Sequence, residues 1–483
     1  MARTDLPNVE TRLYIDGQWL NGSEGTKSVI NPATGKSLID VQQGGKEEAL
    51  KAVKAANKAF PDWAKKAPLE RASLMNKVAS LIDEDKERLA TIMTMEQGKP
   101  LKQALAEIQT NVENLRWNAS EGQRIYGDII PAPVGSQWLV EKQPIGVVGA
   151  ITPWNFPSNM IVRKIAPAIA AGCTVVLKPS SETPLSALAL MELFDKAGFP
   201  AGVVNVVLGK SKPIGEVLST SDDVQKLTFT GSTEVGKLLN EQAAATLKKV
   251  SMELGGHAPF IIFPDADLDL AVKSLIAAKF RNNGQVCTSP NRIFIHETIK
   301  KEVTQMIVEQ MKEVTVDNGL NDPTTGPLIN QDGLEKVVKQ LKDATEKGAT
   351  VLFGGNEMTE QPYADGFFFE PTVIDGITTT MDIYYEETFG PVIPLISFTE
   401  EEEVIEAAND TPFGLASYFF SNNIHTISNV SKRLAYGMVG VNDVEISHSA
   451  TPFGGVKHSG FGRENGAYGV EEYVTVKFVT IKS

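Results

Sequence analysis

Apolar side chains recur at helical spacing in two segments of the N-terminal part of the chain. In residues 46–63 and 69–94 they lie three or four positions apart, with charged residues between them. This spacing predicts amphipathic helices on the surface. Residues 128–142 differ, because two short apolar runs there flank the sequence Val134-Gly135-Ser136. That pattern predicts two short strands joined by a turn.

From residue 144 onward, short apolar runs alternate with helical patterns. Strands are expected at 145–151, 174–177, 203–207, 226–230 and 248–253, with helices at 160–171 and 185–197. A second run follows, with strands expected at 260–263, 292–296, 351–353, 416–420 and 438–441 and helices at 268–280, 298–314 and 400–409. The first alternation predicts a mainly parallel sheet with helices on both faces, and the second predicts another α/β domain.

The C-terminal segment 473–479 alternates between apolar and polar residues, which is typical of a strand. An apolar strand at a terminus needs a partner edge, and either the 128–142 hairpin or another subunit would provide one. We therefore expect these two segments to form a small β element apart from the two larger domains.

Composition and charge exclude several classes of function. The chain has 483 residues, which is too many for one core. Its net charge of -14 argues against nucleic acid or an anionic membrane as the main partner. Two cysteines are too few for a disulfide framework and indicate a reducing compartment. The sequence shows no signal-peptide pattern and no apolar run of about 18 residues, so we expect a cytoplasmic protein without a membrane span.

Three residues are candidates for a nucleophile, a base and an amide donor. Cys287 ends the polar segment Asn283-Gly284-Gln285-Val286-Cys287, a setting that favours a reactive thiol over a buried, inert one. Glu253 ends a predicted strand before two glycines, where a partly desolvated carboxylate can take a proton; a helix cap is the alternative. Asn155 lies in a rigid loop of Trp and Pro residues that can aim its amide at an oxyanion; a buried turn residue is the alternative.

Loops rich in glycine and serine raise the question of a phosphate site. Residues 231–237 match a P-loop up to the lysine, but Leu238 stands where Mg²⁺ needs Ser or Thr, so no nucleoside-triphosphate site is expected. The helix that begins there still offers N–H groups to a pyrophosphate. Residues 460–466 match a dinucleotide fingerprint only loosely and are interpreted as a structural loop. Lys178 follows a predicted strand and can reach a ribose or phosphate, with a solvated lysine as the alternative.

No metal site is expected. The five histidines show no ligand spacing with one another, with cysteine or with carboxylates.

Several motifs, in this order, resemble the aldehyde dehydrogenase superfamily over essentially the whole chain. They are Pro-Trp-Asn-Phe-Pro at 153–157, Phe-Thr-Gly-Ser at 229–232, Glu-Leu-Gly-Gly at 253–256, Gly-Gln-Val-Cys at 284–287, Glu-Glu-Thr-Phe-Gly-Pro at 386–391 and Pro-Phe-Gly-Gly-Val-Lys at 452–457. The resemblance implies an α/β fold with a Rossmann-type cofactor domain, a catalytic domain and an oligomerisation element that joins a homodimer or homotetramer. The boundaries it implies are 1–126 with 145–254, then 255–450, and 127–144 with 466–483.

The resemblance also implies a mechanism. Cys287 attacks the aldehyde carbonyl, Asn155 and the backbone N–H of Cys287 stabilise the oxyanion, and loss of a hydride leaves a thioester. Glu253 then activates the water that releases the carboxylic acid. Lys164 and Glu464 match positions associated with proton relay to this base, and a structural ion pair is the equally weighted alternative.

For the cofactor, the resemblance implies NADP or NAD. Ser181 stands where NAD-preferring relatives often have a glutamate that repels a 2′-phosphate. The serine leaves Lys178 free to bind that phosphate, so we expect NADP to be accepted. A preference for NADP over NAD is a further hypothesis. The implied cofactor-binding residues are Thr152, Trp154, Lys178, Ser181, Gly231, Ser232, Glu387 and Phe389.

Within the superfamily the chain is most similar to the succinate-semialdehyde dehydrogenases. Arg163 and Arg281 match the two arginines that bind the substrate carboxylate in that branch, and Ser447 falls in the loop that supplies a hydroxyl. A surface salt bridge is the alternative for each arginine. Ser289 stands where the branch usually has a second cysteine, so no redox-switching disulfide is expected.

Other readings stay open at this point. The loop 443–451 differs from the usual run of that branch, which leaves glutarate and 2-oxoglutarate semialdehyde as alternative substrates. A dehydrogenase of a neutral aldehyde is a further alternative. A non-catalytic binding or structural protein that kept the fold is the alternative from another class.

Overall fold

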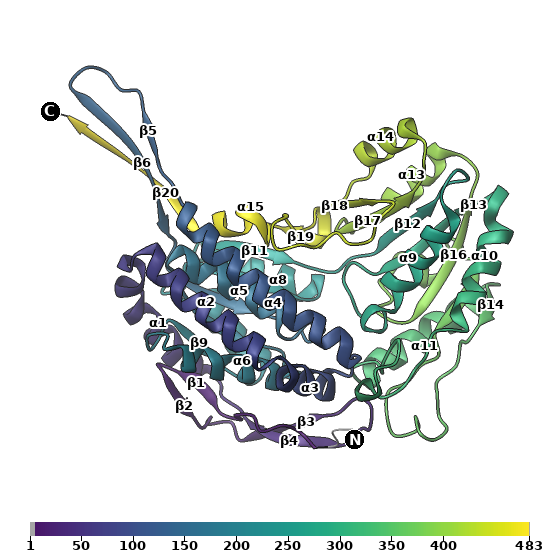
Figure 1. Cartoon of the computed structure of the whole chain (residues 1–483), viewed down its shortest axis with the longest axis horizontal. Coiled ribbons are helices and arrows are strands. Elements are labelled where there is room, and N and C mark those ends of the chain that lie inside the picture. The colour runs from purple at the N-terminus through teal and green to yellow at the C-terminus, as the bar shows by residue number, and fades with distance from the viewer. Residues whose placement is uncertain (1–4, 483) are drawn as a thin grey trace.

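The computed structural model describes residues 5–482, which form two α/β lobes and a projecting β ribbon (Figure 1). The first lobe holds an eight-stranded sheet in the order β19-β11-β10-β7-β8-β9-β1-β2. Its strands are β1 (Leu13–Ile15), β2 (Gln18–Leu20), β7 (Val147–Ile151), β8 (Thr174–Lys178), β9 (Val204–Val206), β10 (Lys226–Thr230), β11 (Lys249–Glu253) and β19 (Gly460–Phe461). Strands β7 to β11 run parallel, as the alternation predicts, while β1 and β19 pair antiparallel at the two sides.

Helices cover both faces of this sheet. On one face, buried residues of α1 (Lys46–Lys65), α7 (Ser211–Thr220) and α8 (Thr233–Ala244) share a core with the strands. On the other face, the core is shared with α2 (Pro68–Glu84), α3 (Lys86–Gln97), α4 (Leu101–Glu121), α5 (Asn159–Ala171) and α6 (Pro184–Ala197). Strands buried on both sides explain why their sequences are continuous apolar runs.

The second lobe holds a seven-stranded sheet in the order β14-β15-β16-β13-β12-β17-β18. Its strands are β12 (Ala258–Ile262), β13 (Pro290–His296), β14 (Thr350–Phe353), β15 (Thr372–Asp375), β16 (Val392–Phe398), β17 (Ala416–Phe420) and β18 (Met438–Val441). Its helices are α9 (Leu268–Phe280), α10 (Glu297–Met311), α11 (Gln331–Glu346), α12 (Asp382–Tyr385), α13 (Glu401–Asn409) and α14 (Ile424–Arg433). The second predicted α/β run is thus confirmed, with small shifts at the ends of its elements.

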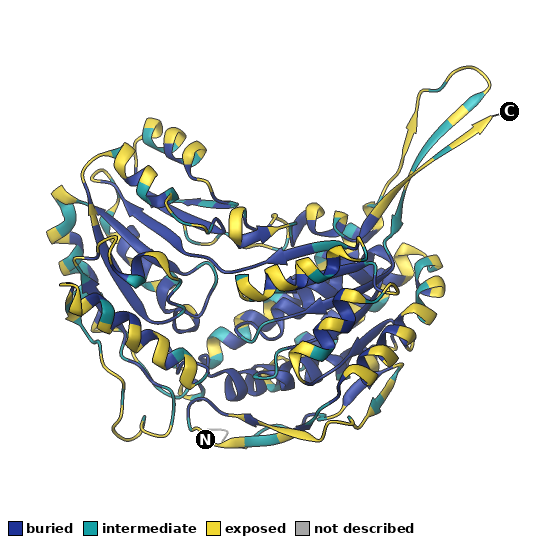
Figure 2. Cartoon of the chain, turned by 180° about the vertical axis from the view of Figure 1, so that it is seen from behind, coloured by how far each residue is buried: buried dark blue, intermediate teal, exposed yellow. Residues whose placement is uncertain are grey.

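The projecting ribbon joins distant parts of the chain. Its strands β5 (Asp128–Ile130), β6 (Ser136–Pro144) and β20 (Val474–Lys482) are antiparallel, with Val474 opposite Pro144 and Lys482 opposite Ser136. The predicted hairpin and the predicted C-terminal strand are both confirmed, and they pair within one chain. The ribbon stands clear of the lobes and is largely exposed, whereas the two sheets are buried (Figure 2). The short helix α15 (Gly466–Glu471) leads into β20, and a second ribbon pairs β3 (Thr26–Ile30) with β4 (Ser37–Gln42).

One prediction for the N-terminal part is wrong. Residues 69–94 form two helices rather than one, because Asp85 between α2 and α3 has φ -105° and ψ 10°. Nor does α3 lie on the surface, since its residues from Leu89 to Gln97 are all buried. Helix α3 packs against α4 and α6, and polar groups such as Glu96 find partners inside the lobe.

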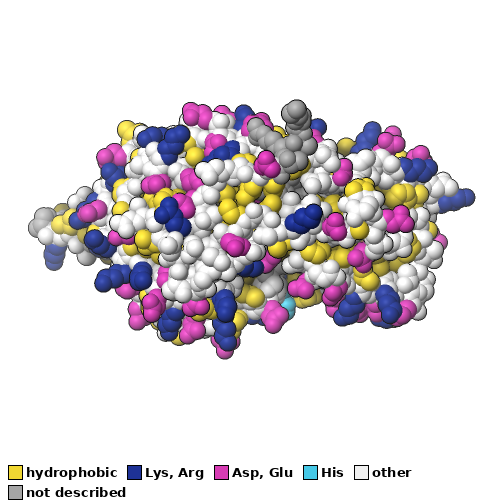
Figure 3. All heavy atoms as spheres, turned by 90° about the horizontal axis from the view of Figure 1, so that it is seen from below, with side chains coloured by type: hydrophobic (Ala, Val, Ile, Leu, Met, Phe, Trp, Pro, Cys, Tyr) yellow, Lys and Arg dark blue, Asp and Glu magenta, His cyan; other side chains and the backbone are white. Residues whose placement is uncertain are grey.

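Surface charges of both signs are mixed. On the face drawn in Figure 3, basic and acidic side chains lie among one another and among apolar ones, without a patch of a single sign. Among residues 5–482, no helix is long and apolar enough to cross a membrane.

Candidate active site

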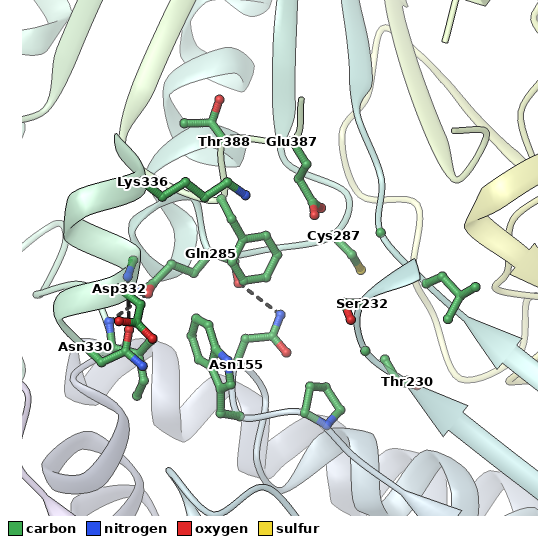
Figure 4. Close-up of a pocket in the computed structure, with 18 of the residues that line it drawn as sticks. Asn155, Thr230, Ser232, Gln285, Cys287, Asn330, Asp332, Lys336, Glu387 and Thr388 are labelled. Atoms are coloured by element: carbon green, nitrogen blue, oxygen red, sulfur yellow. Dashed lines mark hydrogen bonds between the residues drawn. The ribbon is translucent and has the colours of Figure 1, made fainter. Parts of the chain in front are cut away.

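A cavity of about 380 Å³ opens where the two lobes face each other. The first lobe contributes Trp154 and Asn155 after β7, Gly231 and Ser232 after β10, and Leu254 after β11. The second lobe contributes Gln285, Cys287, Asn330, Asp332, Gly333, Lys336, Glu387, Thr388 and Phe389. The carboxyl ends of parallel strands are where such sheets bind ligands. The cavity therefore brings together most of the motifs that were singled out in the sequence (Figure 4).

Cys287 lies on the wall of this cavity and is partly exposed. It follows the 3-10 turn η2 (Arg281–Gly284), in which Asn282 (φ 49°) and Asn283 (φ 57°) both adopt the left-handed conformation. Such backbone is costly for residues other than glycine and clusters at functional sites. Gly256 lets the chain after β11 approach this loop, because a Cβ there would lie 2.2 Å from the carbonyl oxygen of Cys287.

The surroundings of Cys287 favour its neutral thiol. Burial raises its pKa to about 12, and the negative charges of Glu387, Glu253 and Glu464 act in the same direction. The positive charge of Arg163 opposes them. Because the thiolate is the nucleophile, the proton must leave before the sulfur can attack.

Asn155 presents its side-chain amide to the cavity beside the nucleophile loop (Figure 4). Its Nδ2 donates to the carbonyl oxygen of Gln285 at 3.0 Å. A side-chain amide has two N–H groups, so one is left for a substrate oxygen. The arrangement fits a donor for an oxyanion that develops next to Cys287.

Glu253 is the last residue of β11 and is 3% exposed. Neither carboxylate oxygen has a hydrogen-bond partner among the described residues. Burial raises the pKa of Glu253 well above its usual range, and the charge of Glu464 adds to the effect. A buried carboxylate with free oxygens and a raised pKa has the properties of a general base.

Lys164 and Glu464 form a buried ion pair beside this base. Lys164 Nζ lies 2.5 Å from Glu464 Oε1, and Arg163 Nε lies 3.2 Å from Glu464 Oε2. Burial acts to raise the pKa of Glu464, but Lys164 and Arg163 outweigh it and hold the pKa below its usual range. The ion pair exists in the structure, and its electrostatic contact with Glu253 is compatible with the proton relay as well.

The cofactor-side residues predicted from the sequence fall into two groups. Trp154, Gly231, Ser232, Glu387 and Phe389 line the cavity around Cys287. Glu387 Oε1 accepts from the N–H of Gly256 at 3.1 Å, and burial raises its pKa to about 7. Phe389 adopts φ 55° and meets Trp154 edge-on, with 5.5 Å between the ring centres.

The second group lies at the end of β8. Lys178 is buried, its Nζ donates to Ser211 Oγ at 2.9 Å, and burial lowers its pKa to about 8. Ser181 Oγ donates to the carbonyl oxygen of Gly209 at 3.4 Å. The buried Thr152 connects to this strand, since its N–H donates to the carbonyl oxygen of Lys178 at 3.2 Å. Lys178 keeps donors for a ribose or phosphate, and the small Ser181 leaves the surroundings free of a carboxylate at that position, so a dinucleotide phosphate fits here.

A second cavity of about 480 Å³ lies next to the segment that carries Cys287. Val286 and Thr288, the neighbours of Cys287 in the sequence, form its inner wall. Arg281 and Ser447 line it together, so the structure brings these two predicted substrate residues to one place.

Arg163 is placed differently. It is 4% exposed, stacks on the ring of Phe453 at 4.0 Å and is absent from the lining of the second cavity. Its Nη2 has no hydrogen-bond partner among the described residues. The structure thus joins Arg163 to Glu464 in a buried pair, which excludes the alternative of a surface salt bridge, and its role toward the substrate stays a prediction.

Sequence reasoning missed the residues that hold Asn155 in place. Its carbonyl oxygen accepts from Lys99 Nζ at 2.8 Å and from Asn282 Nδ2 at 2.9 Å. Lys99 stands 56 positions before Asn155, so no local pattern connects the two. Lys336 of α11 was missed as well, although it lines the cavity near Glu387. Among residues 5–482 there is no group of three or more His, Cys, Asp or Glu side chains that could hold a metal ion.

Comparison with known proteins agrees with this geometry. The model of the family described as "Aldehyde dehydrogenase family" matches residues 19–479. A 3-sulfolactaldehyde dehydrogenase of Pseudomonas putida is 48% identical over 98% of this chain and 97% of its own length. A glutarate-semialdehyde dehydrogenase of Pseudomonas putida is 47% identical, and the succinate-semialdehyde dehydrogenase [NADP(+)] of Escherichia coli is 46% identical, each over 100% of both chains. The crystal structure of an NADP-dependent enzyme of Escherichia coli superposes with a TM-score of 0.96 at 46% identity, covering 98% of both chains.

Proposed function

The chain belongs to the aldehyde dehydrogenase family, and from this premise we propose that it oxidises short aldehydes with an acid group at the far end, chiefly succinic semialdehyde. It is an NAD(P)-dependent enzyme of that family. The observation that carries the substrate proposal is the second cavity, where Arg281 and Ser447 lie beyond the residues that flank Cys287. A guanidinium and a hydroxyl can hold a carboxylate while the aldehyde reaches the sulfur.

The proposed reaction begins at Cys287. Once Cys287 has lost its proton to solvent, the thiolate attacks the aldehyde carbon, and the free N–H of Asn155 and the backbone N–H of Cys287 stabilise the oxygen that becomes negative. A bound nicotinamide cofactor would supply the acceptor for the hydride that leaves this carbon. Glu253, whose oxygens have no other partner, then takes a proton from water, and the resulting nucleophile cleaves the thioester on Cys287.

We infer that NADP is accepted, and a preference for NADP over NAD is the hypothesis that rates with both cofactors test. Two observations support this: Ser181 adds no negative charge beside Lys178, and the similar enzyme of Escherichia coli carries NADP(+) in its name. Trp154, Gly231, Ser232, Glu387 and Phe389 would hold the nicotinamide half near Cys287, and Thr152, Lys178 and Ser181 the adenosine half.

Two related substrates have support of their own. Glutarate semialdehyde is one methylene longer, and a relative at 47% identity is named for it. For 3-sulfolactaldehyde, a relative at 48% identity carries the name, and a sulfonate is an anion that Arg281 can bind as it binds a carboxylate. 2-Oxoglutarate semialdehyde, which has the same chain length as glutarate semialdehyde, is a further candidate because residues 444–449 of the loop that departs from the usual run line the cavity.

We further propose that copies of the chain assemble through the ribbon into a dimer or tetramer in the cytoplasm. Large apolar side chains are exposed on its strands and turn, among them Ile129, Val134, Val476 and Phe478. Such a surface is unfavourable in water unless another molecule covers it, and a free sheet edge invites pairing.

Initial rates of cofactor reduction test the substrate proposal. The panel is succinic semialdehyde, glutarate semialdehyde, 3-sulfolactaldehyde and butanal, each with NADP⁺ and with NAD⁺. We expect kcat/KM for an acid aldehyde to exceed that for butanal by roughly a hundredfold, the effect of about 3 kcal/mol of anion binding. Equal values would refute acid-aldehyde specificity and favour a neutral aldehyde. No reduction with a wide panel of aldehydes would favour the non-catalytic alternative.

A further inference from the structure

The buried Lys99 donates a hydrogen bond to the main chain of Asn155, the residue proposed to stabilise the oxyanion. Lys99 Nζ donates to the carbonyl oxygen of Asn155 at 2.8 Å and lies 2.6 Å from Glu107 Oε2. The side chains of Lys99 and Glu107 are 1% and 2% exposed. An unpaired charge at such a depth is strongly destabilising, so the two residues require each other.

Glu107 connects this lysine to the start of α5. Its Oε1 accepts the backbone N–H groups of Ser158 at 3.0 Å and Asn159 at 2.9 Å. These are orphan donors of the helix N-terminus, where a carboxylate is favourable. The pair Lys99–Glu107 therefore holds both ends of the short segment between Asn155 and α5.

The loop that carries Cys287 bonds to the same carbonyl oxygen of Asn155. Asn282 Nδ2 donates to the carbonyl oxygen of Asn155 at 2.9 Å, and the side chain of Asn155 donates in turn to Gln285. The carbonyl of Asn155 thus receives one donor from Lys99 and one from the loop that carries Cys287. This shared acceptor connects Lys99 to the loop that carries Cys287.

We propose that Lys99, charged and oriented by Glu107, is a positioning residue that fixes the Asn155 amide relative to Cys287. The inference rests on the role proposed above for Asn155. Lys99 acts through the Asn155 main chain and contacts no reacting atom. Since a displacement of about 1 Å can cost about a hundredfold in rate, loss of Lys99 has a catalytic effect beyond its effect on stability.

The test compares five variants of the full-length protein. Lys99→Met removes the donor, and Lys99→Met with Glu107→Gln also removes the buried negative charge, so this pair serves if the single variant fails to fold. Asn155→Ala and the double variant Asn155→Ala with Lys99→Met complete a cycle. Lys248→Met is the matched control, because Lys248 is also buried and its Nζ donates to a main-chain carbonyl, that of Ser221, at 2.9 Å.

We expect Asn155→Ala to lower kcat by about a hundredfold to a thousandfold, as removal of an oxyanion donor does. Lys99→Met or its paired variant should lower kcat at least about tenfold with little change in KM for the cofactor or in alkylation of Cys287. Adding it to Asn155→Ala should cause little further loss, because both act on one donor. Lys248→Met should keep the parent kcat.

Three results would overturn the inference. Additive losses in the cycle would mean that Lys99 acts elsewhere than through Asn155. A parent-like kcat in the folded Lys99 variants would remove the positioning role alone, because slow Asn155→Ala would still support the proposed oxyanion donor. A parent-like kcat in Asn155→Ala would remove both roles while leaving the aldehyde dehydrogenase activity in place.

Discussion

Replacing Glu253 by glutamine separates the two halves of the proposed reaction. Glu253 makes no hydrogen bond with the described residues, so the amide of Glu253→Gln has the same shape and loses no bond. What it loses is the ability to take a proton from water. A general base contributes about a hundredfold to ten-thousandfold, and we expect steady-state kcat to fall within that range.

The assay is rapid mixing with an acid aldehyde and NADP⁺. Formation of the thioester does not require Glu253 in the proposed reaction, so the variant should still give an initial burst of about one reduced cofactor per active site. The slow phase that follows reports cleavage of the thioester. A steady-state rate within about threefold of the parent, or a burst that disappears altogether, would refute the assignment of Glu253 to the water step.

The pH dependence gives an independent check on the same residue. Burial raises the pKa of Glu253, and only the deprotonated carboxylate accepts a proton, so the parent rate should rise with pH through a midpoint above the usual glutamate range. The contribution of Glu253 to stability changes with pH in the opposite direction. Because its pKa is raised in the folded state, this contribution is greatest below the unfolded pKa and is lost as pH rises through the folded pKa. Glu253→Gln should therefore unfold at the same temperature as the parent or a higher one at neutral pH.

Three further predictions concern the cofactor, the substrate and assembly. Ser181→Glu should lower the NADP⁺/NAD⁺ ratio of kcat/KM at least about tenfold by placing a negative charge near the 2′-phosphate; an unchanged ratio would contradict the cofactor inference. Arg281→Met should lower kcat/KM for succinic semialdehyde about a hundredfold but that for butanal only slightly, and equal losses would mean that Arg281 does not bind the acid. Phe478→Asp, at an exposed apolar site of the ribbon, should shift the species seen by sedimentation toward the monomer, while an unchanged size would rule out this surface as the contact.

Short-range patterns predicted much of the fold because strands and helices leave a period in the sequence. Strand β10 and helix α9 form over the residues expected, since their apolar runs end at clear polar or glycine positions. Helix α4 went unpredicted although Ala104, Ile108, Val112 and Leu115 are spaced for it. Its buried asparagines at 111, 114 and 118 interrupt the apolar stripe. The side chain of Asn111 bonds to Asn159 of α5, and that of Asn118 donates to the helix's own backbone.

Long-range partners account for what the sequence did not predict. Lys164 and Glu464 were identified by motif, but nothing local indicates that Arg163 joins the same carboxylate. Lys99 resembles any solvated lysine next to a proline until the fold brings it to Asn155. A local pattern reports which face of an element is buried, whereas the partner of a buried charge is set by tertiary packing.

The ribbon has a consequence for synthesis. Strand β6 ends at Pro144, yet its partner β20 begins only at Val474. Glu464, the partner of Lys164, likewise lies 300 residues further along the chain. Translation proceeds at about 5–20 residues per second, so for tens of seconds β6 has an open edge and the first lobe has an unpaired buried lysine. A nascent chain cannot form these contacts until Glu464 and β20 have left the ribosome. Emergence of β20, rather than emergence of Cys287, is therefore the event that lets the ribbon and the buried ion pair form.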